Sequence, residues 1–190
     1  GGRSWRIVQI RRRKVYVRSA QHRTETVAIA HKHAPPMGFW LSQRIKEQLL
    51  GASAPEHFTW MAADGCHYLF HFLGRNWGRL TAVALTEVMK RGVSDVGGVL
   101  LAGVLPFSAA GLITAGRRLE YSLAALRDSI VYDLELGPFF KLLPEGTREA
   151  DIRAAVDLDG LAALLTRARL SELTMAQFAR VASVMSLLDN

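Results

Sequence analysis

The stretch HYLFHFLGRNW, residues 67–77, decides the fold class of this chain. Its first half places an aromatic residue at every second position, from Tyr68 to Phe72, as in a β-strand with one apolar face. Gly74 predicts a turn, and the apolar spacing after it predicts a helix over residues 77–90. A strand that turns directly into an amphipathic helix indicates a mixed architecture.

Helical patterns dominate the chain beyond this stretch. Helices are predicted at residues 39–50, 77–90, 117–134, 147–155, 158–170 and 174–188. Thr147 is expected to cap the fourth of them, and Asp157 with Asp159 to cap the fifth. A buried strand is predicted at residues 99–105, whereas residues 57–61 fit no single pattern.

The N-terminal residues follow a different pattern. Strands are predicted at residues 5–10, 14–18 and 24–30. We therefore expect a basic antiparallel β-meander over residues 1–33 and an α/β to helical accessory domain over residues 39–190. The expected fold class is α+β, with the small meander packed with the α/β and C-terminal helical region.

Positive charge is confined to the predicted meander. The chain has 24 Lys and Arg against 17 Asp and Glu, a net charge of +7. Nine of these bases and one acid, Glu25, fall in residues 1–33, so the rest of the chain carries a slight negative excess. A surplus so localised predicts a surface for a polyanion, with nucleic acid or an anionic membrane surface as the candidates.

Three features bear on the compartment. Cys66 is the only cysteine, so an internal disulfide is excluded and a reducing, cytoplasmic location is expected. The start on Gly-Gly rather than Met suggests a fragment of a longer protein. Residues 96–116 are uncharged and long enough to span a bilayer, but their five glycines and Pro106 predict short buried strands and turns. No membrane partner is expected.

Motifs for catalysis are missing from the sequence. No Gly-Lys pair and no DEAD-like acidic box occur, so this chain is expected not to hydrolyse ATP, and no Gly-x-Ser-x-Gly motif offers a nucleophile. Cys66, His67 and His71 cluster, yet a structural zinc site needs four ligands, and histidines in ordinary hydrogen bonds are the simpler interpretation. No catalytic residue, metal or cofactor is expected in this chain.

The meander supplies the first candidate binding residues. Lys14, Tyr16 and Arg18 alternate on one face of a predicted strand, beside the run Arg11–Arg13. Cations neutralise phosphates, and an aromatic ring between them can stack on a base. The alternative is a solvated outer face, whose charges blunt an edge strand.

The turn from Gly74 to Trp77 supplies the second candidate. Backbone amides at the start of a helix, together with Arg75, can hold a phosphate. The alternative is an ordinary tight turn with Trp77 packed in the core.

Four segments together resemble a known family. The first segment combines residues 2–8, which read GRSWRIV, with residues 13–17, which read RKVYV. In the second, residues 67–85, Gly-Arg stands between an aromatic strand and an Ala/Leu-rich helix. The third is residues 94–101, which read SDVGGVLL, and the fourth is a closing helix over residues 157–169. In this order they resemble the region after the winged-helix domain of Lhr-type (large helicase-related) superfamily 2 DEAD/DEAH-box DNA helicases. Val96 departs from that pattern, because the family carries a tyrosine there.

The resemblance implies the accessory C-terminal region of an ATP-dependent 3′-to-5′ DNA helicase that contacts the tracking single strand. The implied partners are single-stranded or forked DNA and the RecA-like motor and winged-helix domains of the same protein, where ATP and Mg²⁺ would bind. Charge pattern and resemblance together predict these DNA-binding residues: Arg3, Trp5, Arg6, Arg11, Arg12, Arg13, Lys14, Tyr16, Arg18, Arg75 and Trp77.

A protein–protein interaction module with no nucleic-acid role is the alternative. In that case the apolar stretch 96–116 and the C-terminal helices would dock a partner, and the meander would be a solvated surface. Salt-dependent affinity for DNA distinguishes the two functions.

Overall fold

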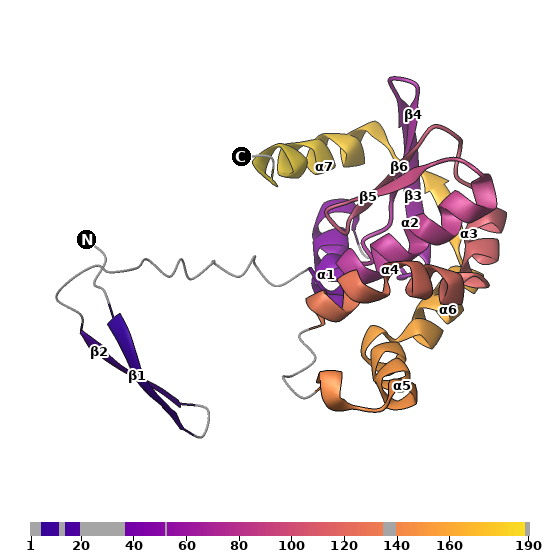
Figure 1. Cartoon of the computed structure of the whole chain (residues 1–190). Coiled ribbons are helices and arrows are strands. Elements are labelled where there is room, and N and C mark those ends of the chain that lie inside the picture. The colour runs from indigo at the N-terminus through magenta and orange to yellow at the C-terminus, as the bar shows by residue number, and fades with distance from the viewer. Residues whose placement is uncertain (1–4, 12–13, 20–36, 52, 135–139, 189–190) are drawn as a thin grey trace. The chain divides into compact units, whose positions relative to one another are not determined.

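The computed structural model describes residues 5–11, 14–19, 37–51, 53–134 and 140–188. The chain divides into two compact units, residues 1–34 and residues 35–190, and each is described by itself (Figure 1). The third strand predicted at residues 24–30 lies outside the described residues.

The smaller unit contains a two-stranded antiparallel hairpin. Strand β1 spans Trp5–Arg11 and strand β2 spans Lys14–Ser19, which confirms the two strands predicted there. The pairing slips by one residue between Ile7 and Gln9, so that Val8 is an extra residue in β1. This slip is a β-bulge, a feature that alternation alone does not predict.

The larger unit is built on a mixed five-stranded sheet. Its strands are β3 (His57–Ala63), β4 (Cys66–Phe70), β5 (Val93–Val96), β6 (Leu100–Gly103) and β7 (Arg169–Glu172), in the spatial order β5-β6-β4-β3-β7. Neighbouring strands are antiparallel except for β3 and β7, which run parallel. A five-stranded sheet with helices gives the α+β class expected from the sequence.

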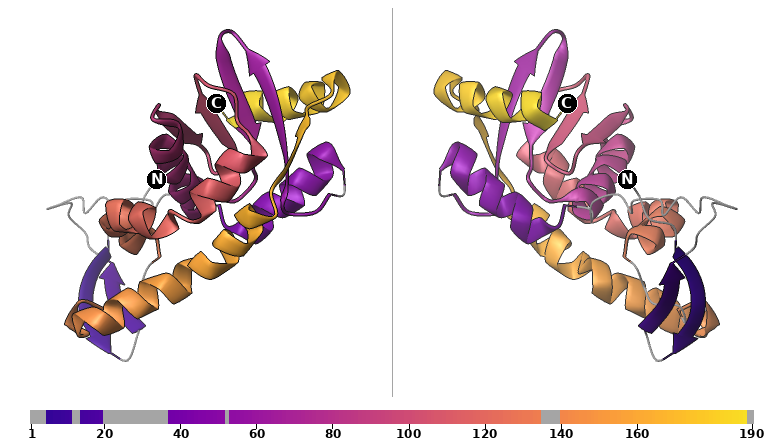
Figure 2. Two further views of the ribbon diagram at one scale, coloured as in Figure 1. Left: turned by 90° about the vertical axis from the view of Figure 1, so that its right-hand side faces the viewer. Right: turned by 90° about the vertical axis from the view of Figure 1, so that its left-hand side faces the viewer.

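Helices make up most of the remaining described chain. They are α1 (Phe39–Leu50), α2 (Arg75–Met89), α3 (Ala109–Gly116), α4 (Leu119–Asp133), α5 (Glu145–Val156), α6 (Leu158–Thr166) and α7 (Met175–Leu188), with a 3₁₀ turn, η1, at Phe140–Leu142. Figure 2 shows α5 and α6 following each other end to end. They are separated by Asp157, whose carboxylate accepts a hydrogen bond from the Gly160 N–H and caps α6 as expected.

Periodicity predicted several of these helices correctly. Helix α1 spans the predicted range 39–50, and Gly51, which follows it with a φ of 88°, stops it. In α4, which lies within the helix predicted at residues 117–134, the helically spaced residues Leu119, Leu123 and Ile130 are buried. Helix α7 begins as predicted, because Thr174 and Gln177 exchange the hydrogen bonds of a capping box.

Three predictions about elements were wrong. Helix α5 begins at Glu145 after Pro144, so Thr147 lies inside the helix and is not its cap. The helix predicted over residues 158–170 ends at Thr166, and the residues after it form β7 because β3 offers them a pairing edge. The apolar stretch 96–116 was expected to hold strands and turns, but it also contains α3.

The sheet separates two apolar clusters. Leu69, Phe58 and Leu101 pack with α2, α3, α4 and α6 on one face. Tyr68 and Phe70 belong to the cluster on the other face, together with residues of α1 and α7. The alternation along residues 67–70 thus produces a three-layer unit. Its central strands are covered on both sides.

The apolar stretch is used within this fold. Leu101 is fully buried on β6, between β5 and β4, and Leu112 is fully buried on α3. Within the described ranges, no helix combines the length and the apolar character needed to cross a membrane.

Candidate functional site

The hairpin register sorts the residues of β1 and β2 by chemical type. Residues directly opposite each other in an antiparallel pair share a face of the ribbon. Arg11 is opposite Lys14, Gln9 is opposite Tyr16, and Arg6 is opposite Arg18. Four cationic residues and the tyrosine therefore occupy one face, which includes the set predicted from the alternation of β2 alone.

The opposite face of the hairpin is mainly apolar. Ile10 is opposite Val15, Ile7 is opposite Val17, and Trp5 is opposite Ser19. Trp5, which was predicted to contact DNA, is therefore on a different face from the cations. Arg3, Arg12 and Arg13, the other predicted contacts of this unit, lie outside the described residues.

The bulge at Val8 is the cause of this sorting. Under strict alternation, Ile7 and Arg11 would share one face, and Arg6 and Ile10 the other. One extra residue reverses the faces of everything that follows it, so Ile10 joins Ile7 and Arg11 joins Arg6.

Arg75 and Trp77, the two predicted contacts in the larger unit, lie in the first turn of α2. Gly74 precedes the helix with a φ of 78°, where a side chain would be strained. A Cβ at Gly74 would also lie 2.6 Å from the backbone oxygen of Met37 and 2.9 Å from the backbone nitrogen of Phe39. The Arg75 N–H donates to the Met37 oxygen at 2.8 Å, so the starts of α1 and α2 are joined backbone to backbone.

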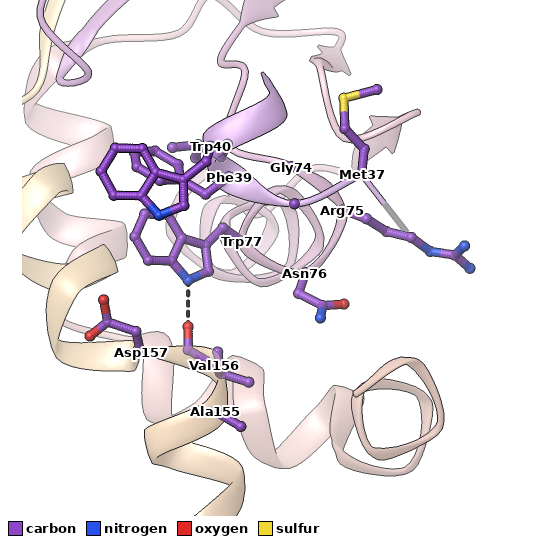
Figure 3. Close-up of a pocket in the computed structure, with 12 residues that line it drawn as sticks. Met37, Phe39, Trp40, Gly74, Arg75, Asn76, Trp77, Ala155, Val156 and Asp157 are labelled. Carbon is purple, nitrogen blue, oxygen red and sulfur yellow. Dashed lines mark hydrogen bonds between the residues drawn. The ribbon is translucent and has the colours of Figure 1, made fainter. Parts of the chain in front are cut away.

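A cleft of about 300 Å³ opens beside this junction (Figure 3). Three segments line it: the start of α1, the start of α2 and the junction of α5 with α6. The lining residues are Met37, Gly38, Phe39, Trp40, Leu73, Gly74, Arg75, Asn76, Trp77, Ala155, Val156 and Asp157.

Aromatic rings form one wall of the cleft. The Trp77 indole N–H donates to the Val156 carbonyl oxygen at 2.6 Å, which fixes the ring against the end of α5. Its ring centre is 4.5 Å from that of Phe39, which in turn contacts Trp40 edge to face at 5.3 Å. Trp77 and Phe39 are half-buried, but Trp40 is 79% exposed. Trp77 is therefore partly packed, in keeping with the alternative of a tight turn with a core ring, and it also lines the cleft. Its contact with DNA stays a prediction.

The cleft carries opposite partial charges at its two ends. The N-terminus of α2 has no acidic residue in its first turn and no side-chain cap, so its backbone amides are a positive pole. The C-terminus of α5 and the Asp157 carboxylate lie across from it (Figure 3). In the same view the Arg75 side chain, which is exposed, extends away from the three rings.

Beneath α2 lies a buried pair that the sequence reasoning did not identify. His71 is fully buried, its Nε2 lies 3.0 Å from Asp95 Oδ1, and its Nδ1 accepts the Leu73 N–H at 3.0 Å. Because Nδ1 accepts, the proton is on Nε2 and is donated to Asp95. His71 is thus in hydrogen bonds, as the simpler interpretation expected, and it supports the turn into α2. In the part of the chain that the structure describes, no group of three His, Cys, Asp or Glu is placed to hold a metal ion.

Comparison with known proteins returns no relative: no family model, no curated protein and no solved structure matches the chain.

Proposed function

We propose that this chain binds single-stranded DNA through the cationic face of the β1–β2 hairpin. The observation that carries the proposal is the register of the hairpin, which collects Arg6, Arg11, Lys14 and Arg18 on one face with Tyr16 among them. Cations spaced along a ribbon match the repeat of a phosphate backbone, and a ring between them can stack on an unpaired base.

The charge distribution supports the same function. A solvated face on an ordinary domain needs no segregation of charge, yet the whole surplus of this chain falls in residues 1–33. The hairpin also separates cations from apolar residues, which gives the ribbon one polyanion-facing side.

The biological setting follows from the resemblance to Lhr-type helicases. We propose that the chain is the accessory region of an ATP-dependent 3′-to-5′ DNA helicase and contacts the tracking strand. The RecA-like motor and winged-helix domains, with their ATP and Mg²⁺, would belong to the parent protein.

Fluorescence anisotropy with a labelled single-stranded oligonucleotide across a salt series tests the hairpin. Each lost phosphate contact lowers the slope of log affinity against log salt by about 0.7. We expect Lys14→Ala with Arg18→Ala to reduce that slope by about 1.4. Tyr16→Ala should leave the slope unchanged but weaken binding by roughly 1–3 kcal/mol for one stacked base.

The matched control is Lys90→Ala, which removes an exposed lysine at the end of α2. It should leave both affinity and slope unaltered. If the hairpin variants behave like this control while the fold is intact, the cationic face is only solvated and the proposal fails.

A protein-docking role is the second candidate. It is favoured by three exposed aliphatic residues around β6: Val96 at 42%, Val104 at 58% and Leu105 at 39% exposure. Most of the apolar stretch is nevertheless used in the core, with Leu101 and Leu112 fully buried. Absence of salt-dependent DNA binding would favour this second function.

A further inference from the structure

Trp40 is the aromatic side chain whose placement calls for an explanation. It stands at the second position of α1, 79% exposed, while the neighbouring Phe39 turns toward Trp77. A large apolar ring left in water at the rim of a cleft is a common feature of binding sites, because covering it removes apolar surface from water.

The shape of the cleft limits what can cover this ring. A volume of about 300 Å³ is at the small end of ligand sites, so it accepts a single flat ring system and not a folded segment. The aromatic wall is fixed on two sides, by the Trp77–Val156 hydrogen bond and by the close backbone approach at Gly74. The site is therefore formed before any ligand arrives.

The positive end of the cleft, at the start of α2, favours a ring that is attached to phosphates. The N-terminus of α2 has no side-chain cap and no acidic residue in its first turn, so it is a positive pole at one end, although its first N–H already donates to Met37. The nearby Asp157 carboxylate is engaged in capping α6 through the Gly160 N–H. An unstacked base of a single strand meets both requirements, since it has a flat face for Trp40 and a flanking phosphate for the end of α2.

We infer that the cleft between α1, α2 and the α5–α6 junction is a second nucleic-acid contact, which takes one unstacked base of a single strand against Trp40. This inference rests on the proposed function, that the chain binds single-stranded DNA. It adds a contact in the larger unit that is distinct from the hairpin and can be tested apart from it.

Photo-cross-linking of the full chain identifies the residue on which a base stacks. The probe is a twelve-nucleotide oligothymidylate that carries one 5-iodo-deoxyuridine, and the cross-linked peptide is identified by mass spectrometry. We expect an adduct at Trp40. Trp40→Ala should weaken binding of the same oligonucleotide roughly 5- to 140-fold, the range for one stacked base.

Tyr121→Ala is the matched control, because Tyr121 is a 57% exposed aromatic residue on α4 outside the cleft. It should leave affinity unchanged. Both substitutions remove exposed rings, so neither is expected to unfold the chain, and circular dichroism checks this.

The outcomes separate the two proposals. An adduct at Tyr16 with none at Trp40, together with wild-type affinity of Trp40→Ala, overturns the cleft and leaves the hairpin standing. An adduct at Trp40, together with wild-type binding by the hairpin variants, overturns the hairpin and leaves the cleft standing. Failure of the full chain to bind the oligonucleotide overturns both. Decaproline tests a proline-rich protein partner instead. The inference is wrong if decaproline quenches the tryptophan fluorescence of the wild type but not of Trp40→Ala, while the two proteins bind DNA with equal affinity. In that case the cleft belongs to a proline-rich protein partner.

Discussion

Gly78 is the position at which α2 packs against the buried His71–Asp95 pair. It faces the His71–Asp95 pair, and a Cβ at this position would lie 2.6 Å from His71 Cε1 and closer still to Asp95 Oδ1. Helix α2 can therefore pack this closely against Asp95 on β5 and His71, which precedes α2, only because position 78 has no side chain.

Gly78→Ala sets two effects against each other. Alanine is the better helix former by about 1 kcal/mol. Overpacking a buried site costs about 1–3 kcal/mol, and here the strained contact is with a hydrogen-bonded pair that cannot move without breaking. We expect the steric effect to win, with a lower free energy of unfolding in urea. Gly92→Ala, where a Cβ meets nothing within 4 Å, is the control and should show no comparable loss.

Lys46 is a buried cation on α1 that organises the loop before β3. Only 2% of it is exposed, and its Nζ donates to the Ala54 and His57 carbonyl oxygens at 2.8 and 2.6 Å. Burial lowers the pKa of Lys46 from 10.5 to about 8, and the Glu56 carboxylate only partly opposes this.

This lowered pKa predicts a pH dependence of stability. Between pH 8 and 10.5 the unfolded chain holds the Lys46 proton and the folded chain does not, so stability rises with pH across this window. The free energy of unfolding of wild type minus that of Lys46→Met should thus be flat below pH 8 and increase above it. Denaturation curves from pH 7 to 10.5 measure the difference, with the exposed Lys90→Met as control. A difference that stays constant over this range would contradict the assignment.

At the scale of elements, the register of the bulged hairpin predicts that DNA binding depends on which face carries a cation and not on composition alone. Exchanging Ile10 with Arg11 keeps every residue type and the net charge, but moves one cation to the apolar face. We expect weaker DNA binding and a salt slope lower by about 0.7. Exchanging Gln9 with Arg11 keeps the cation on its own face and should preserve both. Equal behaviour of the two exchanges would show that net charge, and not the face, governs binding.

The sequence predicted elements where local pattern decides and failed where distant pairing decides. The spacing of Leu119, Leu123 and Ile130 predicted α4, because the apolar residues on the buried face of a helix recur every three or four positions. The strand β7 could not be found this way, since residues 169–172 are extended only because β3 pairs with them. The bulge at Val8 is hidden for the same reason: it exists only relative to β2.

At the scale of the whole molecule, the same division applies to the candidate sites. Charge counting found the residues that the hairpin register gathers on one face, and Gly74 marked the start of α2. The cleft was missed, because its walls come from segments near residues 37, 75 and 156, and no local pattern relates them. Trp40 gave one signal, an aromatic pair with Phe39 at a predicted helix start, but only the fold shows which of the two rings stays in water.

The parallel pairing of β3 with β7 sets the order in which the larger unit can be completed. Ser171, on β7, follows His57 by 114 residues. At a synthesis rate of roughly 5–20 residues per second, β3 leaves the ribosome on the order of ten seconds before the strand that covers its outer edge. During that interval the edge offers unpaired backbone groups to any other nascent strand. The last strand of the sheet to be made is therefore the one that pairs with this edge of β3.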